Sequence, residues 1–222
     1  LEVLNRVLRH NIRTETNLIH GYADMVETSE NKSTVDVIKE HALQIEEMGN
    51  KSRSITNIFE QQRNDSTPKL LDSIITNSIE TVSEEYPAVE FSYSSHSDSL
   101  SVDSVVEPVV YNLLENAAVH NTNPDPQVET TVERKGSTVE LTIADNGPGI
   151  DEYEQAVLEN GTETALDHGS GLGLWLIICG TDLAGGNVTF DETGPTGSVV
   201  TVCVPIHSPS DSAQRSAAKK QS

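Results

Sequence analysis

Three short motifs rich in asparagine, aspartate and glycine follow one another along the chain and offer groups that could bind an anionic ligand with a metal ion. Residues 112–117 are Asn-Leu-Leu-Glu-Asn-Ala, and residues 145–150 are Asp-Asn-Gly-Pro-Gly-Ile. Residues 169–174 are Gly-Ser-Gly-Leu-Gly-Leu. Each motif alone is common, because glycine-rich loops occur in many proteins. Their order and spacing within one small domain make the combination specific.

The first motif carries two amide side chains. Asn116 lies four residues after Asn112, so both fall on one face of a helix. Mg²⁺ takes oxygen ligands, and an amide oxygen together with waters and phosphates suits it. The alternative is an exposed asparagine pair on an ordinary amphipathic helix.

The second motif places a carboxylate after an alternating apolar run over residues 138–144. Asp145 could accept a hydrogen bond from the amino group of adenine, which the carbonyl of guanine could not donate. Gly147 and Gly149 would let the backbone approach a flat base without an intervening Cβ. The alternative is a plain turn, because Asn-Gly and Pro-Gly are strong turn signals.

The third motif opens an apolar run over residues 172–178, which predicts a helix. Gly169, Gly171 and Gly173 would let the backbone approach phosphates, and the N-terminus of a helix favours negative charge. The alternative is a flexible glycine loop with no ligand.

The elements that must position these motifs follow from residue spacing. Helical spacing covers residues 70–82, 105–119 and 172–183, and strand-like runs cover 89–93, 128–133, 138–144, 188–190 and 199–204. The runs at 128–133 and 138–144 predict an antiparallel pair with a turn at Lys135-Gly136. We expect helices packed on one face of a mixed sheet, which is an α/β sandwich.

The order of the three motifs resembles the N, G1 and G2 boxes of the ATP-binding fold shared by histidine kinases, gyrase, Hsp90 and MutL. The resemblance implies that ATP and Mg²⁺ bind here, with Asn116 as the metal ligand and Asn112 supporting the phosphates and their water shell. It implies the following further nucleotide-binding residues: His120, Asp145, Gly147, Gly149, Ile150, Gly169, Ser170, Gly171, Leu172, Gly173, Leu174 and Thr196.

The N-terminal residues 4–14 resemble the phosphoacceptor H-box of sensor histidine kinases. On a helix, His10 falls almost opposite Leu8 and Ile12, so it faces solvent. The resemblance implies that His10 is the phosphoacceptor, and the neighbouring catalytic residues would be Asn11, Arg13 and Thr14. The alternative is an ordinary surface histidine on a coiled-coil-like helix.

Several positions depart from the family pattern. Asn11 stands where the H-box usually has Glu or Asp; it can orient the imidazole but cannot take a proton. Thr14 matches the position linked in the family to phosphatase activity. Val119 stands where a Lys or Arg is frequent, and residues 151–168 contain no Phe, so the aromatic F-box is not evident.

A first apolar stripe with rough helical spacing runs from Leu1 to Val26, and a second apolar register with heptad-like steps runs from Val35 to Phe59. Two such helices form a hairpin that cannot bury both apolar faces alone, and a second copy completes a four-helix bundle. We therefore expect a homodimer through residues 1–62. The expected domains are residues 1–64 for dimerisation and histidine phosphotransfer, 65–206 for catalytic ATP binding, and a disordered tail at 207–222.

The activity implied by the resemblance is ATP-dependent autophosphorylation of His10, followed by transfer to an Asp of a response-regulator receiver domain. A water-using ATPase of the gyrase and Hsp90 type would need a Glu at position 112, and Glu115 lies about 100° away round the helix. An anti-sigma type of serine kinase is disfavoured by the same Asn112. The remaining alternative is an ATP-binding dimeric scaffold, or a phosphatase-biased homologue with weak kinase activity.

The composition indicates the salt concentration and the redox compartment in which the protein works. The formal net charge is −21 over 222 residues, which predicts a surface adapted to high salt and makes nucleic-acid binding improbable. The amino-acid sequence of the H-box region resembles that of histidine kinases of halophilic archaea. Cys179 and Cys203 suggest buried thiols in a reducing compartment. The sequence predicts a cytoplasmic fragment of a longer protein, attached to a membrane only through segments outside it, if at all.

Overall fold

The computed structural model describes residues 12–23, 34–39, 41–43, 45, 49, 68–97, 99–149, 171–192 and 197–207. The chain divides into two compact units, of which the first is Leu1–Asn57 with Glu152–Trp175 and the second is Ile58–Asp151 with Leu176–Ser222. Each unit is described by itself.

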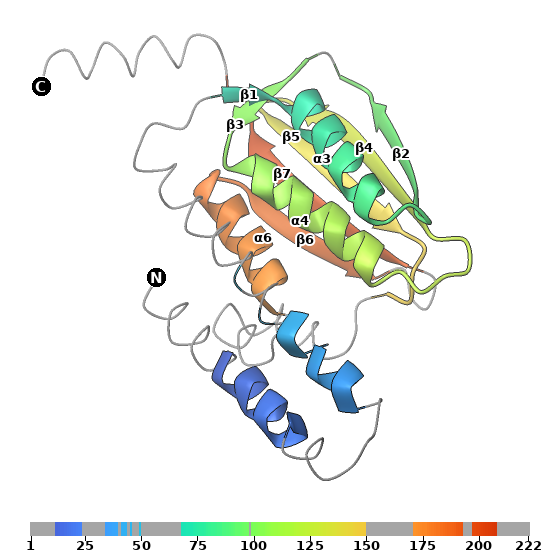
Figure 1. Ribbon diagram of the computed structural model, residues 1–222. Coiled ribbons are helices and arrows are strands. Elements are labelled where there is room, and N and C mark those ends of the chain that lie inside the picture. The colour runs from blue at the N-terminus through green and yellow to red at the C-terminus, as the bar shows by residue number, and fades with distance from the viewer. Residues whose placement is uncertain are drawn as a thin grey trace, which may run out of the picture. The chain divides into compact units, whose positions relative to one another are not determined.

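The second unit is built on a mixed sheet of five strands with the order β2-β4-β5-β7-β6 (Figure 1). The β2–β4 pair is parallel, and the other neighbouring pairs are antiparallel. A separate pair joins two three-residue strands, β1 and β3. The strands are β1 (Pro68–Leu70), β2 (Glu90–Ser95), β3 (Ser101–Asp103), β4 (Gln127–Lys135), β5 (Thr138–Asp145), β6 (Asn187–Glu192) and β7 (Ser198–Pro205).

Helices cover one face of this sheet, as Figure 1 shows for α3 (Leu71–Glu85) and α4 (Val106–Val119). The buried side chains of α3 recur at helical spacing, from Leu71 through Ile74, Ile75 and Ser78 to Val82. A Tyr-Pro pair follows Glu85 in the sequence and stops the helix. The expectation of helices on one face of a mixed sheet is confirmed.

A third helix, α6 (Gly171–Leu183), contains the division between the two units. From Leu176 onward it belongs to the second unit, where Leu176 and Ile177 are buried. Gly185 closes the helix with a φ of 75°, and the Gly186 N–H donates to the Thr181 carbonyl at 3.0 Å. This arrangement is typical of a glycine-terminated helix.

The core lies between the helices and the sheet. On β5, the side chains of Val139, Leu141 and Ile143 are at most 2% exposed, whereas the residues between them are half-buried. This alternation separates a core face from a polar face of the sheet. On the polar face, the hydroxyl groups of Thr142 and Thr201 are 3.2 Å apart across β5 and β7.

The predicted hairpin is present, with the register running from Val128↔Asp145 to Lys135↔Thr138. Gly136 adopts a φ of 67° in its turn, as a tight hairpin of this kind requires. Cys179 and Cys203 are free thiols, but both are half-buried rather than fully buried. Burial is the main reason that the pKa of Cys179 rises to about 11.

In the first unit, residues 12–23, 34–39 and 41–43 are helical. His41 Nδ1 and Glu15 Oε2 lie 2.7 Å apart, and the rings of Tyr22 and His41 stack with centroids 5.9 Å apart. These contacts join the two helices. Across the described residues, no helix has both the length and the apolar character that crossing a bilayer requires.

Candidate nucleotide site

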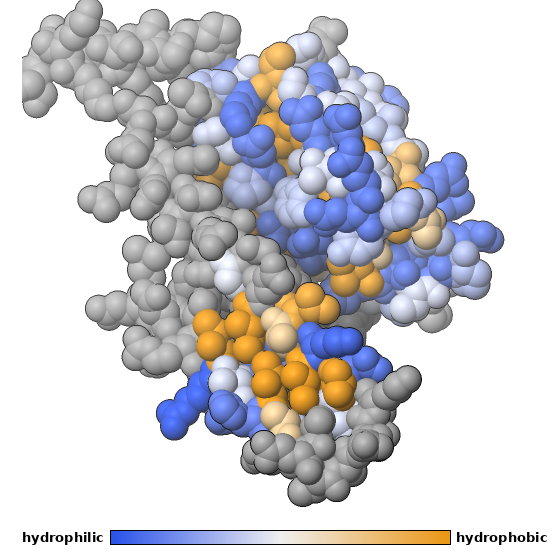
Figure 2. All heavy atoms as spheres, in the orientation of Figure 1, coloured by the Kyte–Doolittle hydropathy of each residue, from blue (hydrophilic) through white to orange (hydrophobic). Residues whose placement is uncertain are grey.

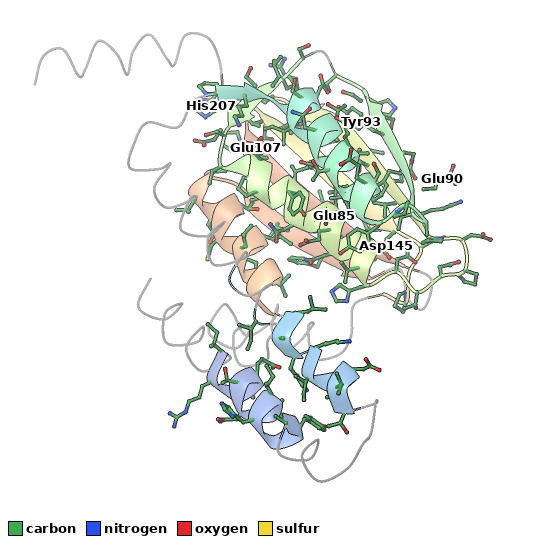
Figure 3. All side chains as sticks on the ribbon, in the orientation of Figure 1. Glu85, Glu90, Tyr93, Glu107, Asp145 and His207 are labelled. Carbon is green, nitrogen blue, oxygen red and sulfur yellow. The ribbon has the colours of Figure 1, made fainter. Side chains whose placement is uncertain are left out.

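Asp145 is the last residue of β5, and Figure 3 shows it where the sheet ends, near the C-terminal end of α4. Its carboxylate is half-buried, and Oδ1 accepts a hydrogen bond from the Gly147 N–H at 2.8 Å. Among the described residues, no hydrogen bond engages the second carboxylate oxygen. The side chain is therefore oriented by its own turn.

Gly147 is buried beside this carboxylate. A Cβ built at this position would lie 2.9 Å from Asp145 Oδ1 and 3.3 Å from the Asn121 Cα, closer than ordinary packing allows. Gly149 adopts a φ of 88°, in the region that favours glycine. The glycines of this motif thus have specific steric roles, and a plain turn does not account for Gly147.

Gly197, which precedes β7, packs onto the backbone of the same residue. It has a φ of 137°, and a Cβ there would stand 1.9 Å from the Asp145 carbonyl oxygen. The sequence places Gly197 only within a glycine-rich turn, so its contact with Asp145 is a feature that sequence reasoning missed. The available signal was the run Gly-Pro-Thr-Gly-Ser at residues 194–198, which is typical of a turn.

The two asparagines of the first motif lie on α4 in different environments. Asn112 is 3% exposed, so the alternative of an exposed pair is wrong for this residue. Its Nδ2 donates to the Pro108 carbonyl at 2.8 Å, while its Oδ1 is buried without a partner in the described part of the chain. Asn116 is half-buried, and no hydrogen bond to its amide is present among the described residues. The Asn116 amide oxygen is therefore available to a metal ion.

Glu115, between these asparagines, is directed toward Tyr111. The Tyr111 hydroxyl donates to Glu115 Oε1 at 3.4 Å, and burial followed by the negative charge of Glu115 raises the pKa of Tyr111. This contact links Glu115 to a residue of its own helix. At the end of α4, His120 is exposed and its backbone N–H donates to the Asn116 carbonyl at 3.1 Å.

The loop after α4 is tied to Asn146 by asparagine side chains, which sequence reasoning also missed. Asn121 Nδ2 donates to Asn146 Oδ1, and Asn123 Nδ2 donates to the Asn146 carbonyl, both at 2.9 Å. The only signal in the sequence was the density of asparagine in a turn-like stretch.

The third motif falls partly outside the described residues. Gly171 and Leu172 are the first residues of α6, Gly173 is buried and Leu174 is half-buried. These four residues belong to the first unit, as do Arg13 and Thr14, which are exposed on the helix of residues 12–23. The predicted site residues that lie outside the described residues are His10, Asn11, Ile150, Gly169, Ser170 and Thr196.

Comparison with known proteins identifies the kind of domain. Residues 101–208 match the family described as histidine kinase-, DNA gyrase B-, and HSP90-like ATPase. The second unit therefore has the ATP-binding α/β fold of this family, as the motifs predicted.

Relatives by sequence include kinases of bacteria. Sensor histidine kinase CitA of Klebsiella pneumoniae is 31% identical over 102 residues, which are 44% of this chain and 19% of CitA. Sporulation kinase B of Bacillus subtilis (strain 168) is 23% identical over 216 residues, or 90% of this chain and 48% of that kinase. This chain thus spans about half, or less, of the length of these relatives.

Among solved structures, the mycobacterial sensor histidine kinase MprB superposes with a TM-score of 0.53 at 27% identity. The match covers 64% of this chain and 99% of the MprB chain. Both the sequence comparison and the structure comparison thus find similarity to histidine kinases.

Proposed function

We propose that the chain is the phosphoacceptor and ATP-binding part of a sensor histidine kinase, and that it autophosphorylates His10 with ATP. The observation that carries the proposal is the presence of two groups that no hydrogen bond from the described residues engages, namely the second carboxylate oxygen of Asp145 at the end of β5 and the side-chain amide of Asn116 on α4. Both lie in a segment that matches an ATPase family whose description includes histidine kinases.

The residues present fit ATP. The free oxygen of Asp145 can accept a hydrogen bond from the adenine amino group, and the missing Cβ of Gly147 leaves room for this carboxylate. The resemblance implies that further residues contact the nucleotide. These are His120, Gly149, Ile150 and Thr196, and the glycine motif at 169–174 would contact the phosphates.

The residues present also fit Mg²⁺. The Asn116 amide oxygen is a suitable hard donor, and the buried carbonyl of Asn112 is a polar atom whose partner is not among the described residues. Bound Mg²⁺ would neutralise phosphate charge, and Asn116 would hold it. Asn112 would support the phosphates and their water shell.

The reaction is phosphoryl transfer. A ring nitrogen of His10 supplies the electron pair for the new P–N bond, the bond from the γ-phosphorus to the bridging oxygen breaks, and ADP leaves. The protein contributes mainly positioning and charge stabilisation. Asn11 would set the imidazole tautomer, and Arg13 and Thr14 would complete the site. His10 would then pass the phosphoryl group to an Asp of a response-regulator receiver domain.

A homodimer through residues 1–62 would complete the phosphotransfer unit. Leu18, Val35 and Leu43 are 40%, 39% and 65% exposed on the helices of the first unit, and Figure 2 shows apolar side chains gathered on the visible face of these helices. Burying such side chains against a second hairpin is favourable. The domains would be residues 1–64 and 65–206, with a tail at 207–222.

A second candidate is an ATP-binding dimeric scaffold, or a phosphatase-biased homologue with weak kinase activity. The observation that favours it is Asn11, an amide where the family has a carboxylate. A relation to kinases of halophilic archaea is a further part of the proposal, supported by the net charge of −21. It predicts that the chain unfolds in low salt and refolds in molar KCl.

The test is labelling with γ-³²P-ATP and Mg²⁺ in high KCl, with His10→Gln and Asn116→Asp as variants. We expect an acid-labile label in the wild-type chain and none in either variant. Saturable ATP binding without label, lost in Asn116→Asp, would favour the scaffold and contradict the kinase.

A further inference from the structure

We propose that three asparagines, Asn121, Asn123 and Asn146, position Asp145 against the adenine base and thereby set the preference for ATP over GTP. We call these three residues the asparagine clamp. The inference rests on the proposed nucleotide site and concerns residues that the motifs do not assign to it. The clamp residues act through Asp145 and are positioning residues rather than ligands.

Asn146 is the centre of the clamp, because both the oxygen and the nitrogen of its amide side chain are hydrogen-bonded. Oδ1 accepts from Asn121 Nδ2 at 2.9 Å and from the Gln127 N–H at 2.8 Å. Nδ2 donates to the Asp125 carbonyl at 2.9 Å. A side chain held from three directions cannot rotate without losing hydrogen bonds, so the position of Asn146 is fixed.

The main chain of Asn146 is held as well. Its N–H donates to the Gln127 carbonyl at 3.3 Å, and its own carbonyl accepts from Asn123 Nδ2 at 2.9 Å. The first of these groups belongs to the peptide that joins Asp145 to Asn146, and the second to the peptide that joins Asn146 to Gly147. The two peptide planes on either side of Asn146 are therefore held by Gln127, the first residue of β4, and by Asn123, in the loop after α4.

Asn121 connects this turn to α4. It lies two residues after the end of the helix that carries Asn116, and its Cα is 3.3 Å from the position of a Cβ on Gly147. The Asn121 Oδ1 accepts from the Asn123 N–H at 3.1 Å, and the Asn123 Oδ1 accepts from the Asp125 N–H at 3.0 Å. The clamp thus ties the helix proposed to hold the metal to the strand end proposed to hold the base.

The consequence for recognition follows from the geometry of Asp145. The only hydrogen bond to its carboxylate among the described residues comes from Gly147 within the same turn, so the direction of the second carboxylate oxygen depends on how that turn is held. A hydrogen bond to the adenine amino group tolerates little displacement. GTP has no amino group at this position, so the clamp should matter for ATP and not for GTP.

The test compares binding of ATP, GTP and inorganic tripolyphosphate to the full chain by calorimetry, with Mg²⁺ in molar KCl. Asn121→Asp keeps an acceptor for Asn123 but removes the donor to Asn146 and places an oxygen against Asn146 Oδ1. We expect ATP affinity to fall about tenfold while GTP and tripolyphosphate affinities stay unchanged. The matched control is Asn77→Asp, which makes the same substitution at an exposed position of α3 and should leave all three affinities unchanged.

A clamp that only stabilised the fold would lower the melting temperature of Asn121→Asp and leave its ATP affinity and ATP preference unchanged in the folded protein; that result overturns the inference alone. A wild-type chain that binds ATP and GTP equally would overturn the adenine site and the clamp together.

If Asn121→Asp does not fold, Asn123→Ala is the second variant to test. It removes only two hydrogen bonds, the one donated to the Asn146 carbonyl and the one accepted from the Asp125 N–H. The Asn123→Ala variant should bind ATP about threefold more weakly than the wild type. Unchanged ATP binding in Asn123→Ala also overturns the inference.

Discussion

The Gly197 backbone packs so closely on Asp145 that a Cβ on Gly197 would stand 1.9 Å from the Asp145 carbonyl oxygen. The contact joins the residue before β7 to the last residue of β5, and these two strands are neighbours in the sheet. Asp145 is therefore held from one side by Gly197 and from another by the asparagine clamp. The backbone that carries the proposed base-binding carboxylate therefore has little conformational freedom.

Gly197→Ala should lower the free energy of unfolding by at least about 2 kcal/mol, because the backbone of Asp145 must move to admit the methyl group. ATP affinity should fall as well. The control is Gly136→Ala, with a φ of 67° but no atom within 4 Å of the new Cβ, which should cost only about 1 kcal/mol of backbone strain. Urea unfolding measures both, and equal losses in the two variants would contradict the contact.

Gly147→Ala should act on binding more than on stability. The new methyl group would meet the end of the Asp145 side chain at 2.9 Å, and a side chain can turn away. It would also lie 3.3 Å from the Asn121 Cα, which needs a shift of only a few tenths of an ångström. We expect about a tenfold loss of ATP affinity with less than about 1 kcal/mol of lost stability. Calorimetric titration and urea unfolding separate the two effects. A large loss of stability with normal ATP binding would show that the carboxylate is not the ligand.

Asn112→Leu should raise the free energy of unfolding by about 1 kcal/mol and abolish phosphorylation. The buried Oδ1 has no partner within the described residues, and replacing such a group by an apolar one of similar shape removes a desolvation cost. The Pro108 carbonyl keeps its place in the hydrogen bonding of α4. Chemical unfolding and γ-³²P labelling provide the two measurements, and a less stable variant would indicate that Oδ1 has a partner.

Tyr93 should make stability depend on alkaline pH. Burial, and then its hydrogen bond to Asp72, raises the pKa of Tyr93 from 10.0 to about 12. A pKa raised in the folded state gives stability that is present below pH 10 and lost as the pH rises toward 12. The difference in unfolding free energy between wild type and Tyr93→Phe should therefore shrink over this range by no more than about 2 kcal/mol. A difference that stays constant would contradict the shift.

The main elements of the second unit could be predicted because their signals are local. The apolar spacing of α3 and α4 and the alternation in β5 each arise from one face that must be buried. The three-residue strands β1 and β3 were not predicted, since three residues are too few to show an alternation. The ATP-binding fold could be predicted because glycine and carboxylate occur at spacings that few other structures need, and the family match over residues 101–208 confirmed it.

The contacts around Asp145 could not be predicted, because they depend on which distant segments the sheet brings together. Gly197 meets Asp145 only through the pairing of β5 with β7, and Asn121 meets Asn146 only because β4 returns beside β5. Nothing local distinguishes these residues from ordinary turn residues. The roles of His10 and Asn11 in phosphotransfer stay predictions that biochemistry must test.

The hydrogen bonds of Asn146 also bear on the chemical ageing of the protein. An Asn-Gly sequence ordinarily loses ammonia when the glycine nitrogen attacks the asparagine side-chain carbonyl and closes a succinimide ring. Here the Gly147 N–H is held by Asp145 at 2.8 Å, and both ends of the Asn146 amide are engaged elsewhere. Neither group can readily turn toward the other while the domain stays folded. The clamp therefore protects the turn beside the proposed adenine site from deamidation, and this spontaneous damage should begin only when the domain unfolds.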